Sequence, residues 1–507
     1  MRTRKALVNM LYSLFSYALL LIFGIIIRRF LLQQFDTEIV GYEGIIADLF
    51  SYVALADFGL DALFNYRLYE AFAKDDKDRV NKLSNMYRTL WNFLGIIVMV
   101  ICTILFFSLN SIFAGKVNNW DIFKINFILY SLSSLSTYFL GYWRSILTAC
   151  QKEYKAIKVE TILNFISFAI KLIVLLFTKN FVLYLLVNTF FILLSKLIVY
   201  LISKKEFTYY QPVKTSLSEF KKEGMLKECS QLIMIKTADV VNWSSTNLFI
   251  SLLLNVNNAT LYFNYAIIGS AIWSAIANFI RPIKSTLADL IYKESKEDSY
   301  NFYKVMDVGC FFLAVVILIG YATVFQSAII FFFGEQYLLP LSFVYAYSFL
   351  YYFAAKSEAT NLFRECFGDY KMESIFSFIA IITAFVLLVF LSKQFGVAGI
   401  ILSTMISYLI IWHARKIIVI SKFYNLSLIE SWFNELLYVL LAASELFICI
   451  KITAFIPMNF IGMLIRGMIS IILPTLINMI IFRKSQFMDT LKTYILNFIS
   501  SRGNKNE

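Results

Sequence analysis

The chain has 507 residues, of which 60% are hydrophobic and 16% are charged. A soluble domain is about half apolar and about a quarter charged, so this composition excludes an ordinary soluble protein. Apolar runs recur from one end of the chain to the other, which also excludes a soluble enzyme with a single membrane anchor. We attribute the formal net charge of +13 to cytoplasmic loops rich in Lys and Arg, rather than to nucleic-acid binding.

The apolar runs, in chain order, predict an all-α integral membrane protein with about 14 transmembrane helices. Because lipid offers the backbone no hydrogen-bond partners, continuous runs of this length must be helical. The first run is too long for a signal-peptide core, so we expect it to be a retained helix. The runs are 6–27, 41–65, 86–109, 121–147, 159–177, 181–202, 226–254, 258–280, 305–330, 341–363, 372–392, 396–414, 433–453 and 461–482.

The distribution of positive charge predicts the orientation. If the N-terminus is cytoplasmic, the segments on that side hold 32 Lys and Arg residues, whereas the loops on the opposite side hold five. This asymmetry, together with an even number of helices, predicts a multi-pass protein with both termini in the cytoplasm.

A weak repeat appears at an offset of about 219 residues. The segment EAFAKDDKDRVNKL after the second run corresponds to LIYKESKEDSYNFY after the eighth, and the loop lengths that follow match. The alternative is that any two rows of helices look alike. We expect two pseudo-symmetric six-helix lobes with the substrate path between them. The predicted organisation is an N-lobe at 1–202, a cytoplasmic linker at 203–225, a C-lobe at 226–420, and two further helices with a cytoplasmic tail at 421–507.

The segment VGYEGIIADLFSYVALADFGLDALFNYRLYEAFAKDDKDRVNKL, residues 40–83, resembles bacterial O-antigen and capsular polysaccharide flippases. These form the polysaccharide transporter branch of the multidrug/oligosaccharidyl-lipid/polysaccharide exporter superfamily. The matching features are Gly41, the Ala56–Gly59 turn, and Tyr66 with Tyr69. The superfamily plan of two six-helix lobes, with two extra helices in many polysaccharide members, fits the whole chain.

This resemblance implies a flippase of the bacterial inner membrane that is not an enzyme. Its substrate would be an undecaprenyl-diphosphate-linked oligosaccharide, moved from the cytoplasmic to the periplasmic leaflet by alternating access. An ion gradient of Na⁺ or H⁺ often drives such transport. The glycan would serve O-antigen, other lipopolysaccharide, or capsule and exopolysaccharide assembly. We expect a monomer, because a two-lobe chain already contains its own cleft.

The sequence predicts no cofactor and no metal site. The six cysteines form no CxxC pair, and the only histidine is His413. The chain also lacks a GxxxxGK[ST] stretch, so we expect that it does not bind ATP to power transport.

The run 226–254 carries the first candidate site. Lys236 and Asp239 lie one turn apart near the middle of the membrane, and Asn242 and the polar residues after it make this helix too polar to face lipid. We predict that Lys236 binds the substrate diphosphate and that Asp239 tunes or neutralises it. The alternative is a structural ion pair.

Acidic residues on the second run form another group. Asp57 and Asp61 share one helical face, and Asp48 lies on the same run. Asp57 is predicted to pair with a cation of the first or seventh helix, or to bind a coupling ion. The alternative for Asp57 is a structural lock at a helix break, which we favour because Gly59 follows closely.

Two arginines are candidates for the ends of the transport path. Arg28 closes the first helix on the side where few positive charges are expected, and Arg281 follows the eighth helix. A guanidinium binds phosphate through paired donors, so each is a candidate diphosphate contact. Other charged residues lie near helix ends, where snorkelling to the interface explains them. These are Arg88, Lys124, Arg144, Lys171, Lys196, Lys451 and Arg466.

The tenth run offers Tyr345, Tyr352 and Lys356 on one stripe, where the tyrosines could stack on sugar rings and Lys356 could bind diphosphate. The fourth run has a similar face of hydroxyl groups at Tyr130, Ser133, Ser134, Thr137 and Tyr138. In a chain with 31 tyrosines, we favour helix packing or an interfacial belt as the explanation of such faces.

Two other functions compete with a flippase. An ion-coupled multidrug or cation exporter of the same superfamily would need unpaired acids in its cavity, whereas a diphosphate favours bases. A membrane polysaccharide polymerase or ligase would need a large outer loop, and the loops here are short.

Overall fold

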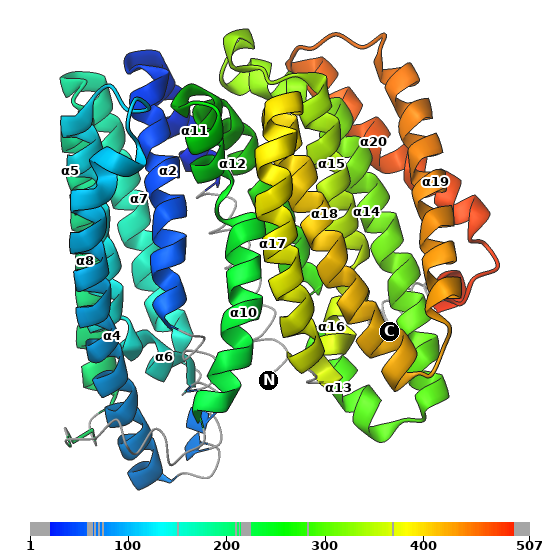
Figure 1. Cartoon of the computed structure of the whole chain (residues 1–507), viewed down its shortest axis with the longest axis horizontal. Helices are drawn as coiled ribbons and strands as arrows, with labels where there is room; N and C mark the ends of the chain where they lie inside the picture. Colours follow the sequence, from blue (N-terminus) through cyan, green and yellow to red (C-terminus); the bar gives the residue numbers. More distant parts are fainter. Residues whose placement is uncertain are drawn as a thin grey trace, which may run out of the picture. The chain divides into compact units, whose positions relative to one another are not determined.

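A computed structural model describes residues 21–57, 76–149, 152–207, 225–280, 283–367 and 370–490, together with a few single positions in 64–72 and 210–213. Within these ranges every regular element is a helix and none is a strand. The predicted all-α fold is therefore confirmed for the part of the chain that the structure describes (Figure 1).

Contacts divide the chain into two compact units, unit 1 up to Phe263 and unit 2 from Asn264. In unit 1, residues 21–34 are helical, ahead of the first labelled element. The labelled elements that follow are α2 (Thr37–Val53), η1 (Ala54–Asp57), α4 (Lys77–Ile112), α5 (Trp120–Leu140), α6 (Tyr142–Ala149), α7 (Glu153–Thr178), α8 (Phe181–Glu206), α10 (Met225–Trp243), α11 (Thr246–Leu253) and the start of α12 (Val256–Ile280).

Unit 2 continues from the rest of α12 and ends with the last described helix. Its elements are α13 (Ile283–Lys293), α14 (Lys296–Phe332), η2 (Glu335–Tyr337), α15 (Leu341–Lys356), α16 (Glu358–Phe367), α17 (Tyr370–Phe395), α18 (Val397–Lys416), η3 (Ile417–Phe423), α19 (Leu428–Thr453) and α20 (Phe460–Ile481). The C-terminal helices α19 and α20 pack on α14.

The boundary between the units differs from the predicted linker at 203–225. It lies further along the chain because α10 and α11 pack against α2, which places them with the first unit. The assignment of two six-helix lobes joined by a linker stays a prediction.

Nine helices in the described ranges are long and apolar enough to cross a membrane: those that begin at Lys77, Tyr154, Phe181, Val256, Lys296, Tyr370, Val397, Leu428 and Phe460. The predicted number of about fourteen stays a prediction. Three predicted runs are interrupted instead of continuous: 121–147 at Gly141, 226–254 at Ser244 and Ser245, and 341–363 at Ser357. Hydropathy misses these breaks because the few polar residues at each one do not interrupt a long apolar run.

The helix pattern repeats along the chain. Helix α4 begins at Lys77 and α14 begins at Lys296, 219 residues later. In each unit this long helix is followed by a helix that breaks into a short one, α5 to α6 and α15 to α16, and then by a hairpin of two long helices. The order of helices thus matches the weak sequence repeat.

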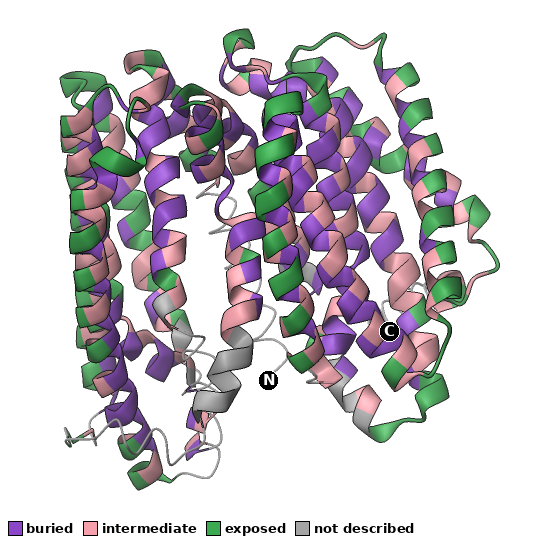
Figure 2. Cartoon of the chain, viewed as in Figure 1, coloured by how far each residue is buried: buried purple, intermediate pink, exposed green. Residues whose placement is uncertain are grey.

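Burial separates inner from outer helices (Figure 2). The most apolar stretches of α14 and α18 are mostly buried, whereas those of α7, α8, α17, α19 and α20 bury only a small share of their residues. Large apolar side chains such as Phe107, Phe177 and Phe390 are more than 60% exposed. Such surfaces are stable only in contact with lipid.

The contact between α2 and α12 requires a glycine. A Cβ at Gly41 would overlap Thr260 Oγ1 and would lie 3.1 Å from Val256 Cγ1. The Thr260 hydroxyl donates a hydrogen bond of 2.7 Å to the carbonyl oxygen of Thr37. This close approach explains why a glycine stands at position 41, in the segment that carries the family resemblance.

We therefore expect Gly41→Val to lower the melting temperature of the detergent-purified protein, because overpacking costs about 1–3 kcal/mol. The matched control is Gly24→Val, since nothing lies within 4 Å of a Cβ at Gly24. Tryptophan fluorescence during heating measures both. Equal melting temperatures for the two variants would contradict the close helix approach.

Candidate functional site

Unit 1 contains a cavity of about 640 Å³ between α2, α4, α5 and α8. Its walls are Glu43, Ala47, Phe50, Ser51, Ala54, Asp57, Trp91, Asn126, Leu129, Tyr130, Ser133, Ser134, Thr137, Tyr138, Leu185, Asn188, Thr189, Ile192 and Lys196. The cavity lies wholly within this unit and is the main candidate for a substrate site.

Helical periodicity gathers these side chains on one side. In α2 and η1 the lining residues recur at intervals of three or four from Glu43 to Asp57, which is one helical face. The hydroxyl-bearing face of α5, from Tyr130 to Tyr138, lines the same cavity. The structure thus places that predicted face at a cavity rather than only in helix packing.

A carboxylate in the first turn of α2 fixes this arrangement. Glu38 accepts hydrogen bonds from the backbone N–H of Asn118, at 2.6 Å, and from the hydroxyl of Tyr42, at 2.6 Å. Asn119 then caps α5 by accepting from the backbone N–H of Ile122 at 3.2 Å. The register of α5 against α2 is therefore set at the α4–α5 loop.

The cavity offers both ring faces and hydrogen-bonding groups. The rings of Phe50 and Tyr130 lie 4.8 Å apart, and those of Trp91 and Tyr138 lie 5.2 Å apart at nearly right angles. The buried amide nitrogen of Asn126 donates to no acceptor among the described residues. Buried amides normally have a partner, so this nitrogen suits a polar ligand.

Lys236 forms an ion pair with Asp57, which lines the cavity. Its Nζ lies 2.8 Å from Asp57 Oδ1, and the two side chains are 42% and 22% exposed. Asp57 thus pairs with a cation of the seventh run, which is one of the roles predicted for it. Asp239, the neighbour expected to neutralise Lys236, is exposed. Because the pair stays accessible to solvent, a ligand can compete for either member.

Glu43 lies in a second cluster of opposite charges. Tyr184 donates a hydrogen bond to the Glu43 carboxylate, and the charges of Arg28 and Lys171 also act on it. The Lys171 ammonium donates to Asn188 Oδ1 at 3.0 Å. Sequence reasoning missed Glu43 and assigned Lys171 to snorkelling. The overlooked signal was that Glu43 lies fourteen positions before Asp57, on the same helical face.

Asp48 contacts the start of another helix of unit 1. It is buried, and its carboxylate accepts from the backbone N–H of Leu248 at 3.0 Å and from Asn247 Nδ2 at 3.2 Å. These groups belong to the first turn of α11, after the break at Ser244 and Ser245. Asp48 therefore caps a helix that begins inside the membrane protein, where a carboxylate is favoured by the helix dipole.

Arg28 is buried rather than placed at an open exit. Its guanidinium donates to the carbonyl oxygens of Val40, at 3.0 Å, and Thr260, at 3.5 Å, and it lies 4.7 Å from the centre of the Phe263 ring. This position ties α2 and the start of α12 to the first described helix. Arg281, its predicted counterpart, lies outside the described residues.

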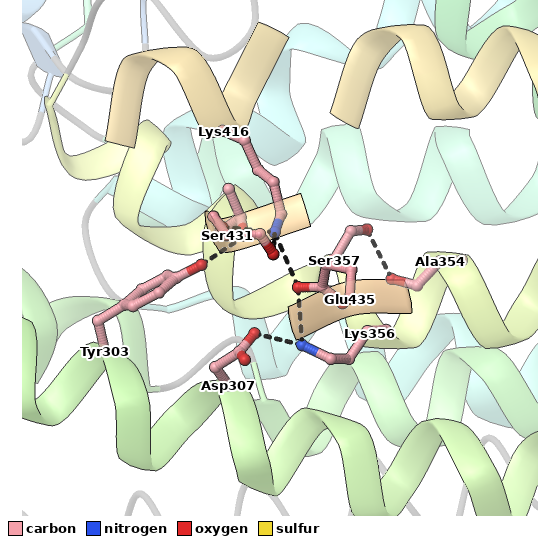
Figure 3. A network of polar contacts seen from close by, with 9 residues as sticks. Tyr303, Asp307, Ala354, Lys356, Ser357, Lys416, Ser431 and Glu435 are labelled. Carbon is pink, nitrogen blue, oxygen red and sulfur yellow. Dashed lines mark hydrogen bonds and ion pairs between the residues drawn. The ribbon is translucent and has the colours of Figure 1, made fainter. Parts of the chain in front are cut away.

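Lys356 belongs to unit 2, where two carboxylates surround it (Figure 3). Its Nζ lies 2.5 Å from Asp307 Oδ1 and 3.2 Å from Glu435 Oε1. Lys416 also binds Glu435 Oε1, at 2.8 Å. Because Lys356 is fully buried and its charge is compensated, it offers no open charge to a diphosphate in this structure. Sequence spacing gave no sign of Asp307 or Glu435 as its partners.

The remaining sugar-facing candidates are not among the residues that line the cavity of unit 1. Tyr345 is half-buried and Tyr352 is fully buried, both in α15 of unit 2. Asn242 is buried near the end of α10, and neither its amide nitrogen nor its oxygen has a hydrogen-bond partner among the described residues. Within unit 1 the structure therefore brings together Lys236, Asp57 and the hydroxyl face of α5, whereas the α15 residues belong to unit 2.

We expect Asp48→Ala to destabilise the protein by about 1–3 kcal/mol, because it leaves buried donors of α11 without an acceptor. Asp48→Asn, which keeps an acceptor oxygen, should retain most of the stability. Asp36→Ala is the control, since the exposed Asp36 makes no side-chain cap bond. Thermal unfolding distinguishes the three. Transport that is lost in Asp48→Asn at normal stability would instead identify a coupling acid.

Ser134→Cys tests whether water reaches the cavity. We expect this thiol to react with a small charged maleimide in purified protein, because the residue lines a polar cavity. Ile128→Cys on the same helix should stay unreactive in lipid nanodiscs, because Ile128 is 45% exposed on an apolar surface. The unsubstituted protein gives the background from native cysteines. Equal labelling at both positions would argue against a hydrated cavity.

No protein-family model and no curated protein matches the chain. Solved structures do match. The lipid II flippase MurJ, in an inward closed conformation, is 15% identical over 94% of this chain and 99% of its own, with a TM-score of 0.70. An inward-facing multidrug resistance MATE family transporter of the MOP superfamily is 11% identical over 80% of this chain and 95% of its own, with a TM-score of 0.59.

A MOP superfamily transporter from Pyrococcus furiosus is 12% identical over 82% of this chain and 95% of its own, with a TM-score of 0.55. At these identities the likeness establishes the fold and not the substrate. The chain thus has the all-α membrane transporter fold that MurJ and MATE transporters of the MOP superfamily share.

Proposed function

We propose that this protein is a flippase that moves an undecaprenyl-diphosphate-linked oligosaccharide from the cytoplasmic to the periplasmic leaflet of a bacterial inner membrane by alternating access. The product would enter O-antigen, capsule or exopolysaccharide assembly. Both termini would be cytoplasmic, and the protein would act as a monomer and not as an enzyme.

The balance of charge around the cavity of unit 1 is the observation that carries this proposal. Two carboxylates line it, Glu43 and Asp57, and each has basic partners. Lys196 adds a positive charge to the walls of the same cavity. Carboxylates compensated by basic partners, together with a lysine in the wall, favour a diphosphate over an organic cation.

The other cavity groups suit the sugar part of such a substrate. Sugar rings stack on aromatic side chains, and their hydroxyl groups exchange hydrogen bonds with serine, threonine, tyrosine and amide groups. All of these side chains occur in the walls of the cavity. The cavity volume of about 640 Å³ is within the range of small-molecule sites and would hold part of an oligosaccharide.

The share of this chain that each similar structure covers also favours a flippase. The likeness to the lipid II flippase extends over 94% of the chain, whereas the likeness to the MATE transporter extends over 80%. The additional share is comparable to the segment that contains α19 and α20. Because the similar structures are a flippase and transporters, we set aside the polymerase or ligase alternative.

An ion-coupled multidrug exporter is the alternative that the fold equally allows. Its support is the pair of carboxylates in the cavity, since Glu43 or Asp57 would bind a cation if its basic partner moved away. Na⁺ or H⁺ could bind the same acids as the coupling ion of a flippase.

The Lys236–Asp57 pair supplies a mechanism for coupling substrate to conformation. A diphosphate that binds Lys236 competes with Asp57, so substrate binding would release η1 from α10. A ligand shifts a conformational equilibrium only through such a difference in contacts. Loss of the pair would therefore favour a state in which α2 and α10 move apart.

We expect Lys236→Ala to reduce surface polysaccharide at least about tenfold in a complementation assay, a loss equivalent to roughly 1.4 kcal/mol or more. Lys236→Arg should retain more activity because it keeps the charge. Lys158→Ala is the control, since Lys158 is exposed and lies outside the cavity. Immunoblots confirm equal abundance. Normal polysaccharide in Lys236→Ala would remove this residue from the mechanism.

Proteoliposomes distinguish the two transport functions. We expect the purified protein to move a fluorescent prenyl-diphosphate oligosaccharide between leaflets, and expect no uptake of an organic cation such as ethidium. Ethidium transport without glycolipid movement would favour the exporter and overturn the flippase.

A further inference from the structure

Unit 2 contains a second cavity of about 640 Å³ that the proposed transport path does not use. It lies at one end of the helices, between the first turns of α14, the start of α19 and the residues that follow α20. Its walls are Tyr300, Tyr303, Lys304, Asp307, Val308, Ile420, Leu426, Ser427, Glu430, Ser431, Asn434, Glu435, Tyr438, Phe482, Ser485, Gln486 and Phe487.

The charged groups in these walls are mainly acidic. Asp307, Glu430 and Glu435 line the cavity, and Lys304 is the one base among its lining residues. Lys356 and Lys416 bind Asp307 and Glu435 from outside the cavity walls and are almost completely buried (Figure 3). Asp307 and Glu435 therefore lie between the cavity and two buried lysines.

Glu435 supplies an independent sign of a missing partner. Its side chain is only 6% exposed, and its Oε2 atom accepts no hydrogen bond from any residue that the structure describes. The other oxygen, Oε1, already binds both Lys356 and Lys416. A buried carboxylate oxygen without a donor is costly, so a ligand that donates hydrogen bonds would stabilise it.

Three tyrosine rings complete the lining. Tyr300 and Tyr303 lie stacked with ring centres 6.0 Å apart, and Tyr438 packs beside the buried lysine, with Lys356 Nζ 4.6 Å from its ring centre. Aromatic faces next to carboxylates bind alkylammonium groups through cation–π attraction.

The apolar surface next to the cavity indicates that such an ammonium would belong to a membrane lipid. Helices α19 and α20 expose large apolar side chains along most of their length, including Phe433, Leu440 and Ile480, each at least 58% exposed. The cavity lies at the ends of these helices, where lipid headgroups meet water. Lys304 and Glu430 are exposed at its margin.

We propose that this cavity binds the headgroup of a phosphoethanolamine lipid. The primary ammonium donates hydrogen bonds to Glu430, Asp307 and Glu435 Oε2, and Lys304 pairs with the phosphate. The acyl chains lie along the exposed apolar surface of α19 and α20. A choline headgroup has no N–H to donate, and a phosphoglycerol headgroup has no positive charge, so the site selects a primary amine.

The test uses the full-length protein, purified and delipidated in detergent. Dihexanoyl phosphatidylethanolamine is titrated against it, in parallel with the choline and glycerol lipids of equal chain length. Native mass spectrometry counts bound lipids and the melting temperature reports affinity. We expect the ethanolamine lipid to bind about tenfold more tightly than the other two, as expected for the loss of a charge-assisted hydrogen bond.

Variants locate the site. Glu430→Gln and Lys304→Gln alter exposed residues, so we expect both to fold and to weaken ethanolamine lipid binding severalfold. Glu297→Gln and Lys393→Gln are the matched controls, because both residues are exposed and neither lines the cavity. Glu435→Gln should weaken binding further, but it also breaks a buried ion pair, so the exposed variants decide the outcome.

Two results would overturn the proposal. Equal affinity for the three lipids, with no effect of Glu430→Gln or Lys304→Gln, would show that the cavity does not select an amine. Soluble phosphoethanolamine that competes at the same concentration as the lipid would assign the site to a free metabolite. Neither result bears on the flippase proposal, which depends on the cavity of unit 1.

Discussion

The carboxylate of Asp48 accepts a backbone N–H in the first turn of α11, and the candidate site of unit 1 depends on that contact. A helix that restarts inside the hydrocarbon region exposes N–H groups that water cannot reach. By supplying an acceptor, Asp48 allows the predicted single helix to break at Ser244 and Ser245. The break holds α10 against η1, where Lys236 reaches Asp57.

Both units have an ion pair next to a second kind of helix break, the break between α5 and α6 in unit 1 and between α15 and α16 in unit 2. In each, a short helix follows directly after a broken one and carries an arginine that pairs with a glutamate of the next long helix. The pairs are Arg144 with Glu160 and Arg364 with Glu373, each at 2.8 Å. Only the second is buried, and there Glu373 also binds Arg415. The two units thus share a plan but differ in how far the charges are removed from water.

The charged groups of this protein fall into two kinds. Buried ion-pair networks, such as the one around Lys356, fix helices to one another, because removing one partner would leave a buried charge uncompensated. Solvent-accessible pairs, such as Lys236 with Asp57, can exchange partners with a ligand at smaller cost. This difference in exposure, rather than residue type, assigns one lysine to structure and the other to the candidate site.

Composition and hydropathy alone determined the helical class, the approximate bounds of the helices and the repeat, because each depends on side-chain polarity along a continuous segment. The polar face of α5 was also visible, as was Lys236 as a candidate site residue, since helical spacing is a local property. Which groups pair was not visible. These contacts join residues from different helices, and only tertiary packing brings them together. They are the contacts of Glu43 with Tyr184, of Asp48 with α11, and of Lys356 with Asp307 and Glu435. The helix breaks likewise depend on distant partners that satisfy the freed backbone groups, which no local sequence pattern encodes.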